Sequence, residues 1–422
     1  MADGVPADAL LRAARRYGTP LYLTSVPGLL QATGELRAAF PDPWLRAFSL
    51  KANDVPPVVA RLAAAGLDAN VVSRGEWAAA TAAGVPNERI TLEGVGKTDA
   101  DLRAAVRAAA TGRPLRWVAL ESAEELGALA ALAGRVGLGR GGARPMEVLL
   151  RLNPDVAPET HAGLAVGRGS SKFGMTETEL TGAVSRLPSD GPVRARGIHL
   201  HVGSQLGAVD AWRDAVRRGL ALLALVGAGR DGFDTFDVGG GFPVGDPGSV
   251  PPPERFAREI GPLLEALPAE RRPARLAVEP GRFLVARSGW LVASVLHVRA
   301  RADAERTIVL DAGMTELVRP ALYGARHAIV ALTSLGRRWD DADGTAGATT
   351  PARVDGPVCE STDTFDHHEL PEVRRGDLVA IADAGAYAAS MAMTYNGRPR
   401  PPQVLLEPDG TLTLGRRRGG DR

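Results

Sequence analysis

The chain has 422 residues, of which 45% are hydrophobic and 23% are charged, as in ordinary folded proteins. This length is about three times the domain average, which predicts two domains, or one large barrel and a second module. Fifty basic residues face 49 acidic ones, giving a net charge of +1. Such a balance provides no overall field for nucleic acid or an anionic membrane, and we expect neither as a partner.

The single cysteine, Cys359, excludes an internal disulfide and any metal site made of several thiolates. A chain so poor in cysteine fits a reducing compartment, and we expect a cytoplasmic location. Charged residues interrupt the N-terminal region, so it lacks the apolar core of a secretory signal. The longest apolar stretch, near residues 220–226, is too short to cross a bilayer, so we expect no membrane segment.

Short apolar runs alternate with alanine-rich segments of helical period, the pattern of βα units around a parallel sheet. The eight expected strands lie near residues 46–50, 67–72, 90–93, 115–120, 147–152, 194–201, 233–238 and 275–279. Expected helices between them include 56–65 and 210–226, the second with Asp210 placed to cap its start. This count and spacing predict an α/β fold with a TIM-like (β/α)8 barrel, which we assign to residues 36–284.

After Arg282 the pattern changes to strand-like runs without long helices between them. These runs lie at 290–298, 306–311, 327–332, 378–382 and 403–406. They predict a second, mainly-β domain, formed by residues 1–35 with 285–422. Residues 336–356 are rich in Gly, Ala, Thr and Asp and are predicted to form a surface loop, and the tail from Arg416 is predicted to fray.

Polar residues stand where the expected barrel strands end, which is where barrel enzymes carry their chemistry. In strand order these residues are Lys51, then Asn70 with Ser73 and Glu76, Arg151, His201, the run Gly239, Gly240 and Gly241, and finally Glu279 with Gly281 and Arg282. Each has an ordinary explanation alone: a solvated lysine, a structural histidine, a tight turn. Their coincidence at one end of one barrel indicates a functional site.

Three of these features together indicate pyridoxal 5'-phosphate as cofactor. The glycine run lets backbone N–H groups approach a phosphate after the seventh strand, where barrels commonly bind one. Glu279 can pair with a heterocyclic nitrogen and keep it protonated, so that the ring accepts electrons. A partly desolvated Lys51 can form a Schiff base with an aldehyde.

Seven short motifs carry a resemblance to a known family. They are Phe48-Ser49-Leu50-Lys51-Ala52-Asn53, His201-Val202-Gly203-Ser204-Gln205, Asp237-Val238-Gly239-Gly240-Gly241, Glu279-Pro280-Gly281-Arg282, Arg319-Pro320-Ala321-Leu322-Tyr323, Val358-Cys359-Glu360-Ser361 and Gly385-Ala386-Tyr387. This ordered set resembles the diaminopimelate decarboxylases, which are barrel-type, alanine-racemase-like enzymes that use pyridoxal phosphate. The resemblance covers nearly the whole chain, and seven motifs in register are far more specific than any one of them.

The resemblance implies a role for each matching residue. Lys51 would bind the cofactor covalently, His201 would stack on its ring, and Glu279 would contact the ring nitrogen. The phosphate would be held by Ser204, Gly239, Gly240, Gly241, Gly281 and Arg282. Arg282, Arg319 and Tyr323 would bind substrate, and both arginines suit a carboxylate. Tyr387 would lie near cofactor and substrate.

The resemblance also implies a head-to-tail homodimer with shared active sites, because Cys359 and Glu360 come from the second subunit in this family. Cys359 would return a proton to the substrate Cα after CO₂ leaves, with Lys51 as the competing donor. An inert buried thiol is the ordinary alternative for a lone cysteine. No metal is expected: His367 and His368 are adjacent, so in an extended segment their side chains point apart, and a solvated loop is the preferred interpretation.

The expected substrate is meso-2,6-diaminopimelate, decarboxylated to L-lysine, because two retained arginines favour an anionic distal group. Some positions depart from the family pattern: Asn70 replaces the usual aspartate, and residues 161–171 and 391–394 also differ. These departures keep open a related decarboxylase of specialised metabolism, such as a siderophore or antibiotic pathway. A racemase and a catalytically inactive regulator are less favoured, since Cys359-Glu360 belongs to the decarboxylase branch and Lys51 is retained.

Overall fold

The computed structural model describes residues 5–167, 171–188, 190–246, 248–301, 304–339 and 348–420. The chain forms two compact units. One comprises Thr33–Lys51 and Leu62–Phe283, and the other comprises Met1–Ala32, Ala52–Arg61 and Leu284–Arg422. We call them the barrel unit and the sheet unit. The domain limits of 36 and 284 stay a prediction.

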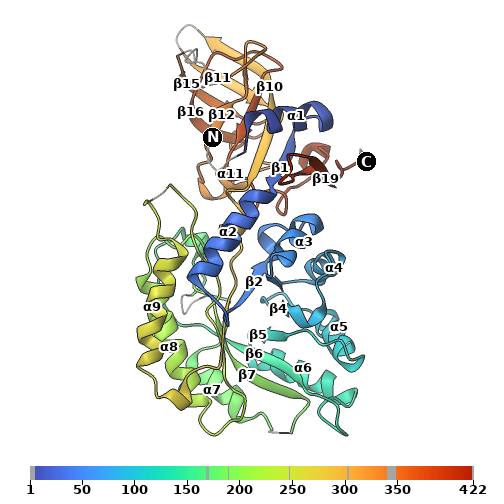
Figure 1. The fold of residues 1–422 in the computed structure, drawn as a ribbon, viewed down its shortest axis with the longest axis vertical. Coiled ribbons are helices and arrows are strands. Elements are labelled where there is room, and N and C mark those ends of the chain that lie inside the picture. The colour runs from blue at the N-terminus through green and yellow to red at the C-terminus, as the bar shows by residue number, and fades with distance from the viewer. Residues whose placement is uncertain are drawn as a thin grey trace. The chain divides into compact units, whose positions relative to one another are not determined.

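Eight parallel strands close the barrel unit in sequence order, from β2 to β9 and back to β2 (Figure 1). They are β2 (Leu45–Ser49), β3 (Asp68–Val71), β4 (Ile90–Leu92), β5 (Trp117–Leu120), β6 (Met146–Leu152), β7 (Val193–Leu200), β8 (Thr235–Asp237) and β9 (Arg275–Val278). The predicted (β/α)8 barrel is confirmed. Trp117, Ala119, Leu149 and Ala277 form one buried apolar cluster between these strands.

Helices follow the strands, and several begin at a residue that can cap a helix. The helices of this part of the chain are α2 (Val26–Ala39), α3 (Pro56–Ala64), α4 (Arg74–Ala82), α5 (Asp99–Ala110), α6 (Ala123–Arg135), α7 (Glu177–Ser185), α8 (Asp210–Val226), α9 (Pro253–Glu265) and α10 (Arg282–Val285). The hydroxyls of Ser73, Thr98, Ser122 and Thr176 each accept a backbone N–H three residues on. These bonds satisfy donors that have no partner inside a helix, which is why α4, α5, α6 and α7 start there.

Helix α8 has the predicted bounds, but the predicted cap is wrong. Val209 is its N-cap and makes no side-chain cap bond. Asp210 is already inside the first turn, where its carboxylate accepts from Arg213 Nη2 at 2.9 Å. The stretch 220–226 lies within this helix, and no helix in the described part of the chain is long and apolar enough to cross a membrane.

The sheet unit is built on a mainly antiparallel sheet in the order β16-β15-β11-β10-β1-β18-β19, with β17 pairing both β10 and β12. Its strands are β1 (Leu21–Ser25), β10 (Gly289–Arg301), β11 (Ala304–Leu310), β12 (Ile329–Ala331), β15 (Thr350–Asp355), β16 (Thr364–Leu370), β17 (Leu378–Ile381), β18 (Gln403–Leu406) and β19 (Leu412–Arg416). Helix α1 (Ala7–Tyr17) packs Leu10 and Ala13 against Leu23 and Trp290 of this sheet. The predicted mainly-β module is therefore present.

Three local predictions in the sheet unit are wrong. The expected loop at 336–356 contains β14 (Arg337–Arg338), which pairs with β13 (Thr333–Ser334), and all of β15. Residues 340–347 lie outside the described part. The tail from Arg416 was expected to fray, but hydrogen bonds fix it to the rest of the unit. Arg418 Nη2 donates to the carbonyls of Tyr17, Thr19 and Pro20, and Gly419 N donates to Arg400 O. The solvated loop expected at His367 and His368 is instead part of strand β16. The imidazole of His367 contacts the carboxylates of Asp366 and Glu305.

Candidate active site

Lys51 directly follows a barrel strand. Strand β2 ends at Ser49, and the short 3₁₀ turn Leu50–Ala52 carries the exposed Lys51 at its middle. The chain has two other lysines. The side chain of Lys97 is fully buried, with Nζ 3.1 Å from Glu125 Oε1, and Lys172 Nζ lies 5.4 Å from the centre of the Phe173 ring. Lys51 is therefore the lysine best placed for chemistry at the carboxyl end of the strands.

The glycine run after β8 makes a turn that only glycine fits. Gly239 has φ = 69°, and a Cβ there would lie 2.4 Å from Leu200 O. A Cβ on Gly240 would lie 2.2 Å from Glu279 O. The backbone of the turn thus lies directly against the ends of β7 and β9, with no side chain between them. A backbone without side chains lets a phosphate group come close to it.

Two further predicted phosphate contacts meet nearby in the same unit. Arg282, a buried residue of α10, donates from Nη2 to Ser204 Oγ at 3.1 Å. Ser204 belongs to the loop after β7 and Arg282 to the segment after β9. Because all these loops leave the same end of a parallel barrel, a guanidinium, a hydroxyl and the glycine turn lie at one rim.

His201 is held as a neutral imidazole. Burial, and then the positive charge of Lys51, place the pKa of His201 well below its ordinary value. The Nδ1 atom accepts from the backbone N–H of Gly240 at 3.3 Å, so the ring hydrogen sits on Nε2. A neutral, oriented imidazole is suited to packing on a flat ring.

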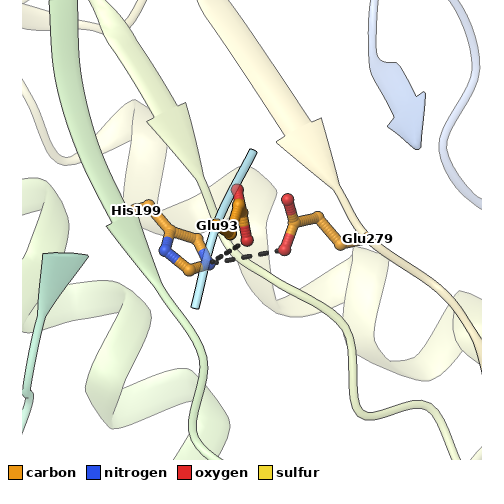
Figure 2. A group of neighbouring side chains, drawn as sticks. All are labelled: Glu93, His199 and Glu279. Carbon is orange, nitrogen blue, oxygen red and sulfur yellow. Dashed lines mark ion pairs between the residues drawn. The ribbon is translucent and has the colours of Figure 1, made fainter. Parts of the chain in front are cut away.

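Glu279 belongs to a buried polar cluster that the sequence analysis did not assemble. Figure 2 shows Glu93, His199 and Glu279 facing one another, with His199 Nε2 3.4 Å from an oxygen of each carboxyl group. Asn70 Nδ2 donates to Glu279 Oε1 at 2.6 Å, and Asp237 is fully buried beside them. The available signal was the placement of charged residues at the ends of otherwise apolar strands.

Protons can balance most of the charge in this cluster. Burial, followed by the charge of Glu279, raises the pKa of Glu93 to about 8. Burial, followed by the charges of Glu279 and Glu93, raises the pKa of Asp237 well above its ordinary value. Burial lowers the pKa of His199 to about 4. Glu93, His199 and Glu279 offer ligand atoms within 4.8 Å of one another and could also hold a metal ion.

The barrel rim fits pyridoxal phosphate. The cofactor needs an amine for its aldehyde, a carboxylate for its ring nitrogen and donors for its phosphate. Lys51, Glu279 and the pair of Arg282 with Ser204 offer these three chemistries. The turn at Gly239 and Gly240 carries no side chain that would keep a phosphate from its backbone, and a Cβ at either position would meet the carbonyl oxygen of Leu200 or Glu279.

The remaining predicted residues belong to the sheet unit. Arg319 and Tyr323 begin and end α11 (Arg319–Tyr323), and Arg319 Nη1 lies 3.0 Å from His327 Nε2. Tyr387 has φ = 56°, and its backbone N–H donates to Ala52 O at 2.8 Å. Cys359 is exposed, and the neighbouring Glu360 carboxylate accepts from Tyr395 Oη at 2.8 Å.

Residues 29–286 match the model of the pyridoxal-binding domain of pyridoxal-dependent decarboxylases. This match and the barrel define the chain as a pyridoxal phosphate-dependent decarboxylase. The diaminopimelate decarboxylase of Deinococcus radiodurans is 37% identical over 399 residues, which cover 94% of this chain and 92% of that protein. That of Zymomonas mobilis is 34% identical over 409 residues, covering 96% and 91%.

Solved structures agree in fold over the full length. Diaminopimelate decarboxylase from Helicobacter pylori, complexed with L-lysine, is 30% identical with a TM-score of 0.86, covering 97% of this chain and 96% of that one. The M. jannaschii enzyme, also in complex with L-lysine, is 28% identical with a TM-score of 0.85, covering 97% and 91%. The chain belongs to the diaminopimelate decarboxylase family of pyridoxal phosphate-dependent carboxy-lyases.

Proposed function

We propose that this enzyme removes CO₂ from meso-2,6-diaminopimelate and releases L-lysine. The observation that carries the proposal is the position of Lys51, Glu279 and the glycine turn, which all follow strands of one barrel in a chain of this family. The L-lysine bound in two related structures supports the identity of the product.

The cofactor-binding residues proposed here follow the chemistry of the rim. Lys51 provides the amine that binds the aldehyde carbon. With the cofactor bound, Glu279 would contact the ring nitrogen, and His201 would pack its neutral imidazole on the ring face. Ser204, Arg282 with Gly281, and the backbone of Gly239, Gly240 and Gly241 bind the phosphate. We assign Tyr387 to the edge of this site on the family resemblance.

Bound pyridoxal phosphate supplies an electron sink for the pair left on Cα when CO₂ departs. The protein's own part is electrostatic and positional. The Glu279 carboxylate would keep a proton on the ring nitrogen of the bound cofactor, which would make the ring a stronger electron acceptor. The neutral His201 adds no charge beside the ring that would compete with this effect.

A proton must then reach Cα, because CO₂ leaves its bonding pair behind. The Cys359 thiol is our first choice as donor, and the ammonium of Lys51 is the alternative. Cys359 is exposed in the single chain, which is consistent with a thiol that serves a second subunit. Glu360 beside it would help to bind substrate.

Substrate choice rests on the two arginines. A guanidinium binds a carboxylate in a bidentate fashion, so Arg282 and Arg319 suit an amino acid with a second, distal carboxylate. Tyr323, one helical turn beyond Arg319 in α11, would contact the same substrate. A site selecting lysine or ornithine would more naturally place a carboxylate at position 319.

We also propose a head-to-tail homodimer in which Cys359 and Glu360 complete the partner's site. The proposal rests on the family resemblance and on the exposure of the thiol. A cytoplasmic location is proposed on the single cysteine, which suits a reducing compartment.

The test is direct. The purified protein, loaded with pyridoxal phosphate, is incubated with meso-diaminopimelate, and lysine is detected by chiral mass spectrometry with CO₂ measured in parallel. The expected result is L-lysine and CO₂ in equal amounts, and neither product from Lys51→Ala.

The same assay separates the alternatives. Release of CO₂ from another amino acid, with none from diaminopimelate, would indicate a decarboxylase of specialised metabolism. Inversion of an amino acid without CO₂ would indicate a racemase, and absence of bound cofactor would indicate an inactive relative. Each of these results contradicts the proposal.

A further inference from the structure

Gln205 joins the two loops that carry the proposed phosphate contacts. It follows Ser204 in the loop after β7, and its side-chain amide bonds to the backbone of Val244 in the loop after β8. Nε2 donates to Val244 O, and Oε1 accepts from Val244 N at 3.1 Å. One side chain therefore satisfies both backbone polar groups of one residue, as a neighbouring strand would.

Main-chain contacts bring the same two loops together. Leu206 N donates to Gly241 O at 3.2 Å, and a Cβ on Gly241 would lie 2.5 Å from Gly203 O. The amide of Gln205 extends this contact to Val244, beyond the glycine run. The loop that carries the serine hydroxyl is thus paired with the loop that carries the glycine turn.

The loop after β8 has a second anchor, between the glycine run and Val244. Phe242 is only 2% exposed, and the centre of its ring lies 5.5 Å from that of Phe40 and 5.3 Å from that of Phe256. Contacts of this kind hold a side chain in one place. Phe242 thus fixes the loop to the body of the barrel unit, and the two bonds of Gln205 fix it to the loop of Ser204.

The backbone of Gln205 has a conformation that glycine adopts more easily. Its φ is 59°, in the left-handed region, where a residue with a side chain is strained. A glycine would avoid this strain but could make neither bond to Val244. The two bonds therefore account for a glutamine at a position whose backbone favours glycine.

We propose that Gln205 is a positioning residue for the phosphate of the bound cofactor: its amide holds the loop of Ser204 and the turn at Gly239, Gly240 and Gly241 at the separation at which both can bind the phosphate. A site whose parts are already in place binds more tightly, because less freedom is lost on binding. This inference rests on the proposed function, in which these two loops bind the phosphate. Gln205 acts through them and touches neither substrate nor cofactor.

Three variants of the full chain test this role. Gln205→Met keeps nearly the same length and the same backbone strain but makes neither bond. Gln205→Gly also lacks both bonds and relieves the strain, so it separates a lost position from a loss of folding. Asn87→Leu is the matched control at the amino end of β4, where the Asn87 amide accepts from Trp77 Nε1 and donates to Arg113 O. Circular dichroism and the melting temperature establish that each variant is folded.

The measurement is the dissociation constant of two ligands, pyridoxal phosphate and pyridoxal, which has the same ring and aldehyde without the phosphate. Each is titrated into the full chain freed of cofactor, and the absorbance of the bound ligand is followed. For both Gln205 variants we expect the affinity for pyridoxal phosphate to fall about tenfold and that for pyridoxal to change less than about twofold. Asn87→Leu is expected to bind both ligands within about twofold of the wild type, even if its melting temperature falls.

The outcomes separate this inference from the proposed function. An active wild type whose Gln205 variants bind pyridoxal phosphate equally tightly would overturn the role of Gln205 and leave the function intact. An equal loss of affinity for both ligands would also overturn it, because the phosphate would then not be the group affected. If Gln205→Met does not fold, Gln205→Gly decides between the same outcomes. A wild type that binds no pyridoxal phosphate and releases no CO₂ would remove both.

Discussion

At the scale of single residues, the buried polar cluster of the barrel is the feature that sequence analysis found least completely. Lys51, His201 and Glu279 stood at the ends of predicted strands and could be predicted from their position alone. Glu93 and His199 face Glu279 only because three separate strands of a closed barrel turn them toward one point (Figure 2). Such a meeting depends on barrel closure and strand register, which the residue pattern does not specify.

Glu93 provides a prediction at this scale. Its pKa is raised to about 8 in the folded chain, mainly by burial, against an ordinary value of 4.5. The folded state therefore binds a proton more tightly than the unfolded state, and the resulting stabilisation is lost as pH rises through this window. Glu93→Gln cannot titrate, so its melting temperature relative to wild type is expected to rise by about 3 °C or more between about pH 6 and pH 8.5.

Differential scanning fluorimetry at the two pH values measures this difference. Glu124→Gln is the control, because Glu124 is an exposed residue in the first turn of α6, and its offset from wild type should stay constant. An offset for Glu93→Gln that does not change with pH would contradict the protonation assigned to the cluster.

At the scale of elements, the strands and helices of the barrel were largely predictable and the edges of the sheet unit were not. The predicted runs overlap all eight barrel strands, because strands buried on both faces are continuous apolar stretches. The strand β15 (Thr350–Asp355) lies in a segment of polar and small residues, and it forms by pairing with β11 and β16. One partner, β11, is distant in sequence, so the local pattern does not reveal this strand.

The turn after β8 provides the prediction at this scale. Gly240→Ala would place a Cβ 2.2 Å from Glu279 O, so the turn must move away from the end of β9. We expect the affinity for pyridoxal phosphate to fall about tenfold or more, since phosphate binding depends on the exact position of this backbone. Equilibrium titration of the apoprotein measures the loss.

Gly96→Ala is the matched control for the turn. Gly96 also lies in a barrel loop, but a Cβ there would meet nothing within 4 Å, so this variant should bind the cofactor as the wild type does. Equal affinity in the two variants would argue that the phosphate is bound elsewhere.

At the scale of the whole molecule, the residues that the family resemblance assigns to the reaction belong to two units of the chain. Lys51 lies in the barrel unit, and Cys359 lies in the sheet unit. The pattern of apolar runs predicted the fold of both units, and the sequence resemblance predicted the family, because seven motifs retain their order along the chain. The assignment of Cys359 to the second subunit comes from the family resemblance alone. The dimer therefore has a test of its own.

Mixing two inactive proteins tests the shared site. If Cys359 serves the partner's Lys51, a dimer of one Lys51→Ala chain and one Cys359→Ala chain has one complete site and one doubly defective site. Random exchange of subunits is then expected to restore about a quarter of wild-type CO₂ release. No restoration, with exchange verified by native mass spectrometry, would place both residues of a site in the same chain.

The central claim is that the amine of Lys51 holds the cofactor, and one measurement tests it most directly. The loaded protein is reduced with borohydride and digested, and each peptide is weighed by mass spectrometry. Because Lys51, Lys97 and Lys172 are the chain's three lysines, the assignment is unambiguous. We expect the mass of a reduced pyridoxyl phosphate group on the peptide that contains Lys51 and on no other. A label on Lys97 or Lys172, or no label on a protein that releases CO₂, would contradict the account.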